Sequence, residues 1–564
     1  MHRLFETHRL RRHRYLDGQW QFVTDPEDRG KTERWFESFP AGADRHFVPS
    51  CWNNELGLYH YEGVAWYRTT FRSDAANLRL VFHGVNTEAD VYLDGRHLGY
   101  HYGGFMKFGF TVRGVRQGEH TLTVRVDNRH NAVDTIPLAR VDWFHYGGII
   151  RSVEVMELAD LWQRECRIDY TLTGADQADL TVEAVAENLS DGAATAAFTI
   201  FADDKILHQR EVTLAPGENR LRVEGLKLDG IERWDLDHPR LYEIRLVLGQ
   251  DDLAERIGFR EVRAEKGRIL LNGRPVFLKG VNRHEDHPDW GFAFPQKLMK
   301  KDLEIIRKLG CNTIRCSHYP NSEAFLDLCD AEGMLLWEEI PMWGFPEEAL
   351  KNQLVLERGL AFHRAMVERD RHHPCIILWG LHNEIDTTCE AGYEITEAFA
   401  RAVRALDPTR LITYASDKDL ADRCFSFADV ISVNRYFGWY RGTYRDWPAH
   451  LDALRAKLRQ EGLADRPLVV SEFGAAGIYG DTGFESRKWS EQYQRELLEY
   501  AIKLFAGDPG IAGFYIWQFC DIRSAQEMEG NRARSFNNKG VVDEYRRPKL
   551  AYWELERIIN GIRR

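Results

Sequence analysis

The stretch Ile376–Glu384, which reads IILWGLHNE, decides the fold of this chain, because an apolar run passes directly into His382, Asn383 and Glu384. The same pattern recurs at Pro467–Glu472, which reads PLVVSE. Short apolar runs of this kind are typical of strands buried on both faces, as in a parallel sheet. Polar residues at the carboxyl ends of such strands lie where α/β folds place their active sites.

Outward from these two runs, β segments alternate with amphipathic helices from about residue 263 to residue 564. The pattern predicts strands at Val276–Val281, Thr313–Cys316, Met334–Glu339, Ile376–Leu381, Leu411–Ala415, Val430–Val433, Pro467–Val470 and Ile511–Trp517. It predicts helices at Pro295–Leu309, Ser322–Glu332, Leu354–Arg371, Tyr393–Leu406, His450–Gln460, Glu491–Phe505 and Tyr552–Ile562, with little helix after the fifth strand. Eight strands with intervening helices indicate a (β/α)8 TIM barrel over residues 263–564.

The remaining part of the chain is predicted to be two β-sandwiches. Short alternating segments such as Asn77–Phe82 and His120–Val126, separated by Gly, Asn and Asp, indicate a jelly roll over residues 1–160. Evenly spaced strands such as Leu180–Glu187 indicate an immunoglobulin-like sandwich over residues 161–262. The expected fold is therefore a multidomain β plus α/β protein.

Bulk properties exclude several classes of function. The net charge of -12 argues against a nucleic-acid partner. No apolar run reaches the roughly 20 residues that cross a bilayer, so no membrane partner is expected. The nine cysteines form no CxxC pair, and the Arg- and His-rich segment Met1–Arg14 leads into no apolar stretch. We therefore expect reduced thiols and a cytoplasmic location.

Glu384 and Glu472 end the fourth and seventh predicted strands, which lie roughly opposite one another in a closed barrel. Facing carboxylates about 5–5.5 Å apart serve a retaining glycosidase, one as nucleophile and one as acid/base. The alternative is that each glutamate only pairs with Arg315, Arg283 or Lys539. Two such residues at the functional face favour catalysis.

Other catalytic chemistry fits the sequence less well. His284, Glu285 and Asp286 are adjacent, so their side chains diverge rather than converge on a metal ion. There is no HExxH helix, no Walker-type loop and no GxGxxG motif. Neither a metal nor a cofactor is therefore expected, and His284 and His318 are interpreted as partners of sugar hydroxyls or of carboxylates.

Four motifs resemble glycoside hydrolase family 2. They are Val281–Asp286, Arg315–Pro320, Trp379–Glu384 and Ser471–Gly474. The order of jelly roll, immunoglobulin-like sandwich and barrel is also that of the family. The resemblance implies that Glu384 is the acid/base and Glu472 the nucleophile, and that Asn383 binds the hydroxyl next to the anomeric carbon.

Further features resemble the β-glucuronidase branch of that family. In Asn434–Tyr440, the resemblance implies that Tyr436 touches the nucleophile and Tyr440 the sugar. In Asp142–Gly148 it implies that Asp142 reaches the sugar, and in Asn537–Gly540 that Asn537 and Lys539 bind a glucuronate carboxylate. The substrate-binding set that we expect is Asp142, His284, Asn383, Asn434, Tyr436, Tyr440, Trp517, Asn537, Lys539 and Arg534. The last assignment is open, because Arg532 and Arg534 bracket the position of the upstream arginine.

Several alternative functions are compatible with these motifs. A β-galacturonidase would use the same carboxylate clamp and differ at the 4-hydroxyl, a β-galactosidase would need no fixed lysine, and an inactive sugar-binding scaffold is the non-enzymatic alternative. The segment Pro341–Asn352 is short, which leaves the aglycone side open. A small glycoside, a glucuronide first, is the expected partner, and a homo-oligomer is expected by analogy.

Overall fold

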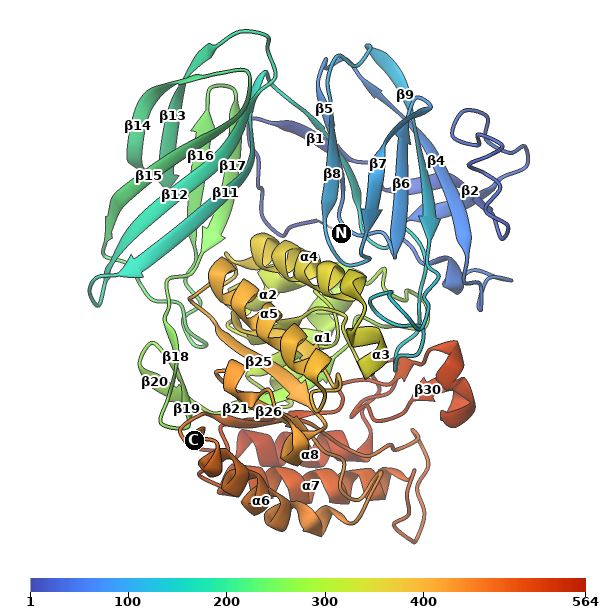
Figure 1. Cartoon of the computed structure of the whole chain (residues 1–564), viewed down its shortest axis with the longest axis vertical. Helices are drawn as coiled ribbons and strands as arrows, with labels where there is room; N and C mark the ends of the chain where they lie inside the picture. The colour runs from blue at the N-terminus through green and yellow to red at the C-terminus, as the bar shows by residue number, and fades with distance from the viewer. Residues whose placement is uncertain (1, 564) are drawn as a thin grey trace.

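The structure, a computed structural model, describes residues 2–563 and contains two β-sandwiches and a barrel (Figure 1). The first sandwich packs the sheet β1-β10-β5-β8 on the sheet β3-β2-β4-β9-β6-β7. Its core is a cluster of apolar side chains from both sheets, which include Trp20, Leu80 and Val124. The strands are β1 (Arg12–Tyr15), β2 (Gly18–Thr24), β3 (Asp44–Val48), β4 (Val64–Ser73), β5 (Leu78–Phe82), β6 (Glu88–Leu93), β7 (Arg96–Tyr102), β8 (Phe108–Val112), β9 (Gly118–Asp127) and β10 (Val153–Glu157).

The second sandwich packs the sheet β11-β12-β15 on the sheet β14-β13-β16-β17. Burial alternates along its strands, as in β16, because one face of each sheet packs on the other sheet. The strands are β11 (Leu161–Leu172), β12 (Gln177–Asn188), β13 (Ala194–Ala202), β14 (Lys205–Leu214), β15 (Gly217–Asp229), β16 (Tyr242–Leu248) and β17 (Asp251–Ile257). The segment before β1 reaches this sandwich, where Arg11 pairs with Asp251 at 2.7 Å.

The third part is a closed barrel of eight parallel strands, as the sequence predicts. The strands are β21 (Leu278–Arg283), β22 (Thr313–Cys316), β23 (Leu335–Glu339), β24 (Ile376–Asn383), β25 (Leu411–Ser416), β26 (Ile431–Asn434), β27 (Leu468–Phe473) and β28 (Gly513–Ile516). All are buried along their whole length apart from Lys279, because neighbouring strands and the surrounding helices cover them.

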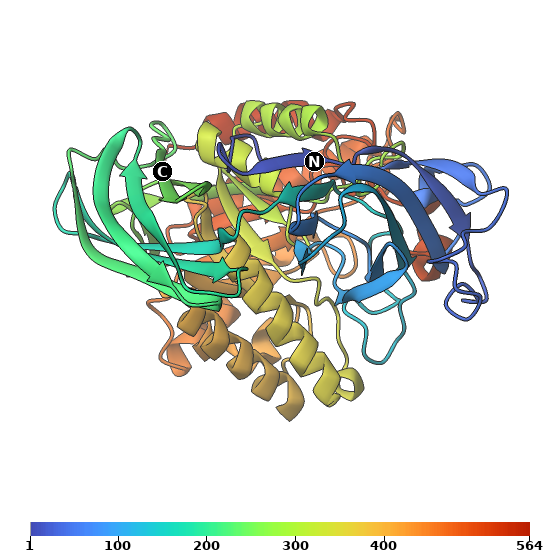
Figure 2. The same ribbon diagram turned by 90° about the horizontal axis from the view of Figure 1, so that it is seen from above.

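Helices follow most of the barrel strands, as expected for this fold. They are α1 (Gln296–Lys308), α2 (Glu323–Glu332), α3 (Glu347–Leu350), α4 (Gln353–Asp370), α5 (Glu390–Leu406), α6 (Trp447–Gln460), α7 (Glu491–Gly507) and α8 (Leu550–Asn560). Only short 3-10 turns follow β25, in agreement with the weak helical pattern there. The two β-sandwiches lie on one side of the barrel in Figure 1 and on opposite flanks of the molecule in Figure 2.

Two features of the fold do not follow from the pattern of the sequence. A small sheet of β18 (Val262–Glu265), β19 (Arg268–Leu271) and β20 (Arg274–Val276) precedes the barrel, so Val276 belongs to β20 rather than to the first barrel strand. In addition, the segment between β9 and β10 packs into the apolar core of the barrel through Val141, Trp143 and Phe144. Within residues 2–563, no helix is long and apolar enough to cross a membrane.

Candidate active site

Glu384 follows the last residue of β24 at the carboxyl end of the barrel. Its backbone has a φ of +53°, a left-handed conformation that is uncommon outside glycine and that clusters at functional sites. The Nδ2 atom of Asn434 donates to its Oε1 atom at 2.8 Å. Burial first, and then the charge of Glu472, raises the pKa of Glu384 well above its usual range.

Glu472 lies on β27 and is 3% exposed. Arg315 donates to its Oε1 atom at 2.7 Å, and the Tyr436 hydroxyl donates to its Oε2 atom at 2.6 Å. Burial raises the pKa of Glu472, whereas Arg315 and Tyr436 lower it. Both oxygens of Glu472 thus accept from strong donors, which favour its charged form, whereas burial and the charge of Glu472 favour the neutral form of Glu384.

Arg315 orients the groups around the carboxylate pair. It binds Glu339 through two hydrogen bonds of 2.8 and 2.9 Å, and it donates to Asn383 Oδ1 at 2.7 Å. The Asn383 Nδ2 atom is buried and has no partner among residues 2–563, so it is free to donate to a ligand. A single guanidinium therefore fixes both Glu472 and the amide of Asn383 beside Glu384.

Trp517 lines the cavity, and His284 and His318 pack against it. The Trp517 ring stacks on the His318 ring with centroids 5.1 Å apart. The His284 ring is perpendicular to the Trp517 ring, with centroids 5.6 Å apart. Burial and neighbouring cations lower the pKa values of His284 and His318 well below the usual range, so both rings are neutral. Their Nε2 atoms are buried without a partner among residues 2–563. Neutral rings with a free nitrogen suit hydrogen bonding to sugar hydroxyls.

Lys539 is a buried ammonium beside Tyr436 and Tyr440 of the cavity lining and is 1% exposed. Its Nζ atom donates to the Tyr440 hydroxyl at 2.9 Å and to Asn537 Oδ1 at 3.4 Å. The rings of Tyr436, Trp439 and Tyr440 lie 5.0–5.8 Å from it. No carboxylate among residues 2–563 pairs with this cation.

Asp142, from the jelly-roll domain, contacts the residues around Lys539. Asn537 donates to its Oδ2 atom at 2.7 Å, and Arg532 pairs with its Oδ1 atom. The Asp142 side chain is only 11% exposed, because the segment between β9 and β10 is anchored in the barrel core. The aspartate thus reaches the site from another domain.

The assignment of Arg534 to the site is wrong, and Arg532 occupies the expected position. Arg534 has a left-handed φ of +60°, and its guanidinium pairs with Glu544 at 2.9 Å, outside the cavity. Two successive left-handed residues, Arg534 and Ser535, turn this side chain away. Such a turn has no signal in the residue types present here.

The cavity that these residues enclose has a volume of about 260 Å³. That volume lies at the small end for ligand pockets and suits one sugar unit rather than a chain. Its lining contains Asp142, Asn434, Tyr436, Tyr440 and Trp517 together with both catalytic candidates, and Asn383, His284, Asn537 and Lys539 lie directly behind.

Some lining residues are missing from the predicted set, among them Trp343, Asp417, Met528 and Arg441. Trp343 follows β23 and bridges to Asn383, so its place after a barrel strand could have identified it. Met528 lies on a loop that contacts the jelly roll, where Arg140 approaches its sulfur at 3.4 Å, and nothing in its local sequence signals this.

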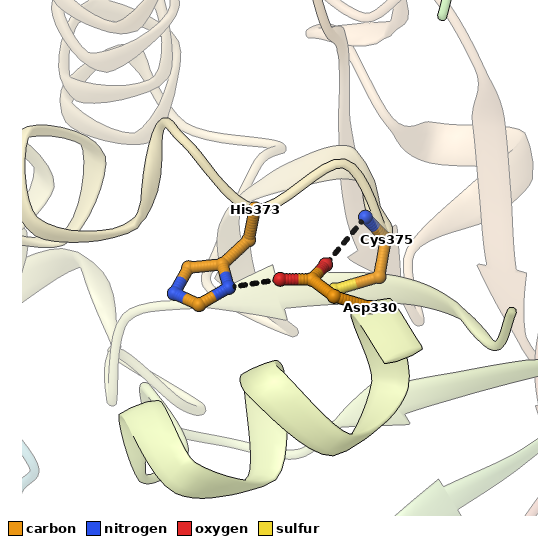
Figure 3. A group of neighbouring side chains, drawn as sticks. All are labelled: Asp330, His373 and Cys375. Carbon is orange, nitrogen blue, oxygen red and sulfur yellow. Dashed lines mark hydrogen bonds and ion pairs between the residues drawn. The ribbon is translucent and has the colours of Figure 1, made fainter. Parts of the chain in front are cut away.

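Figure 3 shows a second cluster of side chains, none of which belongs to the cavity lining. The potential ligand atoms of Asp330, His373 and Cys375 lie within 4.8 Å of one another, as in a metal site. These groups already have partners within the protein: Asp330 accepts from His373 Nδ1 at 2.5 Å and from the Cys375 backbone N–H at 3.0 Å, and the Cys375 sulfur donates to the Leu326 carbonyl at 3.7 Å. We therefore interpret the cluster as a structural contact that holds α2 against the segment before β24.

The barrel region, residues 262–564, matches the family model described as the TIM barrel domain of glycosyl hydrolases family 2. The chain belongs to glycoside hydrolase family 2. Two further models of this family match residues 49–140, described as galactose-binding domain-like, and residues 164–260. The predicted family, the three-part fold and the glycosidase class of the enzyme are thereby confirmed.

The family 2 chain is similar to uronidases over nearly its whole length. It is 28% identical to a β-glucuronidase of Paenibacillus borealis over 588 residues, which cover 95% of each chain. It is also 28% identical to the β-glucuronidase of Homo sapiens over 618 residues, covering 96% of this chain and 90% of the relative.

Two solved structures are similar as well. A GH2 β-galacturonidase from Eisenbergiella tayi, bound to galacturonate, superposes with a TM-score of 0.93 at 34% identity, and the match covers 100% of both chains. A β-glucuronidase from Ruminococcus gnavus, in complex with a C6-substituted uronic isofagomine, superposes with a TM-score of 0.86 at 28% identity over 99% of both chains.

Proposed function

We propose that this glycosidase removes a single β-linked hexuronic acid, a glucuronide first, from the end of its substrate. The observation that carries the proposal is the buried ammonium of Lys539, which has no carboxylate partner among residues 2–563. The other fully buried lysine, Lys549, pairs with Asp521 at 2.7 Å. Because burying an unpaired charge is costly, the missing counter-charge of Lys539 is expected from the substrate.

In the proposed mechanism, Glu472 attacks the anomeric carbon while Glu384 protonates the glycosidic oxygen. The C–O bond to the aglycone breaks, and a covalent glycosyl–enzyme ester forms. Glu384, now ionised, takes a proton from water, which attacks the same carbon and releases Glu472. The raised pKa of Glu384 and the donors on Glu472 support these roles.

The other site residues are proposed to hold the sugar. Asn383 Nδ2 donates to the hydroxyl next to the anomeric carbon, and Asn434 keeps Glu384 in place. His284 and Trp517 line the sugar ring, and Tyr436 orients the nucleophile. Asn537 and Tyr440 complete the clamp around Lys539, and Asp142 faces the hydroxyls at that end.

A β-galacturonide is the second candidate substrate, and the likeness to the Eisenbergiella tayi β-galacturonidase supports it. The two uronides carry the same carboxylate and differ only in the 4-hydroxyl. The pair of Asp142 and Arg532 lies beside the clamp and would contact that hydroxyl.

Chromogenic β-glucuronide, β-galacturonide, β-galactoside and β-glucoside, assayed side by side, test the proposal. We expect the highest kcat/KM on one of the two uronides and at least tenfold less on both neutral glycosides. A galactoside or glucoside turned over faster than either uronide would refute a uronide function while leaving the glycosidase class intact.

A cytoplasmic location and a homo-oligomeric state remain proposals. All nine cysteines are free, which suits a reducing compartment. Exposed apolar side chains such as Phe484 and Trp553 offer surface for self-association. Cell fractionation and light scattering after size-exclusion chromatography test the two points, and a secreted protein or a monomer at micromolar concentration would contradict them.

A further inference from the structure

The mouth of the active-site cavity carries a positive charge that the proposed reaction does not use. Arg441 lines the cavity and is exposed to solvent. Its guanidinium forms no ion pair or hydrogen bond with any of residues 2–563. The other two arginines of the lining are neutralised, because Arg532 pairs with Asp142 and Arg435 pairs with Asp419. Arg441 therefore contributes an uncompensated charge.

The exposure of the lining residues indicates which part of a substrate Arg441 meets. Glu472 and Trp517 are 3% and 2% exposed, so the blind end of the cavity holds them. The sugar that loses its bond must lie at that end, against the carboxylate pair. The leaving group then extends towards the exposed residues at the mouth, which include Arg441.

The other groups near the mouth are balanced in charge or aromatic. Asp417, which also lines the cavity, pairs with Lys418 at 2.6 Å. Trp343 is half-buried, lines the cavity and is joined to Asn383 at the end of β24 by a backbone bridge. Aromatic rings of this kind pack well on the faces of flat or ring-shaped groups.

We propose that the aglycone subsite binds a ring that carries a negative charge, with Arg441 as the counter-ion. This inference rests on the proposed uronidase function and names the aglycone of the same substrate. A second acidic sugar and an aromatic acid share this chemistry.

The first test compares 4-carboxyphenyl and 4-carbamoylphenyl β-glucuronides, or the matching galacturonides if these are the better substrates. The two aglycones have nearly the same shape and differ in charge. The substitution Arg441→Gln should lower the carboxylate-to-carboxamide ratio of kcat/KM about threefold to fivefold, which corresponds to the free energy of a solvent-exposed ion pair. Because the ratio is compared between two enzymes, the different reactivity of the leaving groups cancels.

The same ratio in the wild-type enzyme should fall as salt is raised, since salt screens exposed charges. Arg445→Gln is the matched control, because Arg445 is exposed on the same loop and lies outside the cavity lining. An unchanged ratio in Arg441→Gln would overturn the inference. If both substrates also lost activity by the same factor, Arg441 would be assigned to the sugar that is cleaved. Failure to hydrolyse any uronide would overturn the proposed function as well.

A second arm distinguishes the two sources of such an aglycone. β-Glucuronosyl disaccharides with a neutral hexose or a hexuronate at the reducing end are compared in the same two enzymes. If Arg441→Gln lowers the hexuronate-to-hexose ratio of kcat/KM, the aglycone is an acidic sugar. If Arg441→Gln lowers only the ratio measured with the aryl glycosides, the aglycone is an aromatic acid.

Discussion

At the scale of single residues, the environment distinguishes two chemically identical carboxylates. Glu472 accepts from Arg315 and Tyr436, which stabilise its charged form, whereas Glu384 has only the amide of Asn434. Two like charges in a buried site cannot both ionise easily, so the less well supported group keeps the proton. The order of the two pKa values thus follows from the hydrogen bonds around each glutamate.

Replacing the two glutamates separates their roles. Glu472→Gln should lower kcat by at least about 10⁴-fold with every leaving group, because no nucleophile remains. Glu384→Ala should lose far less in the glycosylation of a nitrophenyl uronide than of an alkyl uronide, since nitrophenolate needs little protonation. Azide should restore turnover of Glu384→Ala and form the β-glycosyl azide, identified by proton NMR. Equal losses on activated and poor leaving groups would refute the acid/base role of Glu384.

We expect the Tyr436 hydroxyl to influence the acid limb of the pH profile through Glu472. It donates to the charged form of Glu472 and lowers the pKa of that group. Tyr436→Phe should therefore raise this pKa, and the acid limb of kcat/KM should move to higher pH. Tyr493→Phe is the control, because its hydroxyl donates to the Gly438 carbonyl and to no carboxylate. A limb that stays in place, or moves to lower pH, would contradict the assignment.

At the scale of elements, the barrel could be predicted from the sequence because its strands are buried apolar runs and its helices are amphipathic. Predicted and observed bounds agree to within three residues for most elements, as for Ser322–Glu332 against α2 and Leu354–Arg371 against α4. The loops were harder to predict. The position of Arg532 depends on left-handed turns that no residue type announces, so the sequence alone could not distinguish it from Arg534.

The buried pair of Asp330 and His373 should stabilise the barrel in a pH-dependent way. Burial is the largest single influence and lowers the pKa of His373, but the charge of Asp330 and its hydrogen bond together raise the pKa overall. A histidine with a raised pKa stabilises the fold below the unfolded value, about 6.5, and this contribution is lost as pH rises through the folded value.

Asp330→Asn should therefore cost about 3–5 kcal/mol at pH 6, which lowers the thermal midpoint by on the order of 10 °C. The loss should be smaller at pH 9, where the histidine is neutral in both states. Glu332→Gln, at an exposed position of the same helix, is the control. Thermal unfolding followed by circular dichroism checks this, and an equal loss at both pH values would refute the charged pair.

At the scale of the whole molecule, three parts of the chain build one site. The barrel supplies both carboxylates, the loop after β28 supplies Lys539, and the jelly roll supplies Asp142 through a segment buried in the barrel core. The resemblance to family 2 could indicate Asp142, but periodicity could not, because the contact joins residues 395 positions apart. The net charge of -12 also matters, since long-range attraction does not favour an anionic substrate and a local cation must bind it.

The proposed role of Lys539 as that cation is tested most directly by the selectivity of Lys539→Met for a uronide over the matching neutral glycoside. Methionine keeps much of the length of the apolar stem and removes the ammonium that lies 5.0 Å from the centroid of the Tyr440 ring. A buried hydrogen bond to a charged group is worth about 1.5–3 kcal/mol, and leaving the carboxylate unpaired costs more. The kcat/KM on a nitrophenyl glucuronide or galacturonide should thus fall by about 10² or more, and that on the glucoside or galactoside by far less. If both substrates lose the same factor, Lys539 only supports the loop, and the uronide function is contradicted.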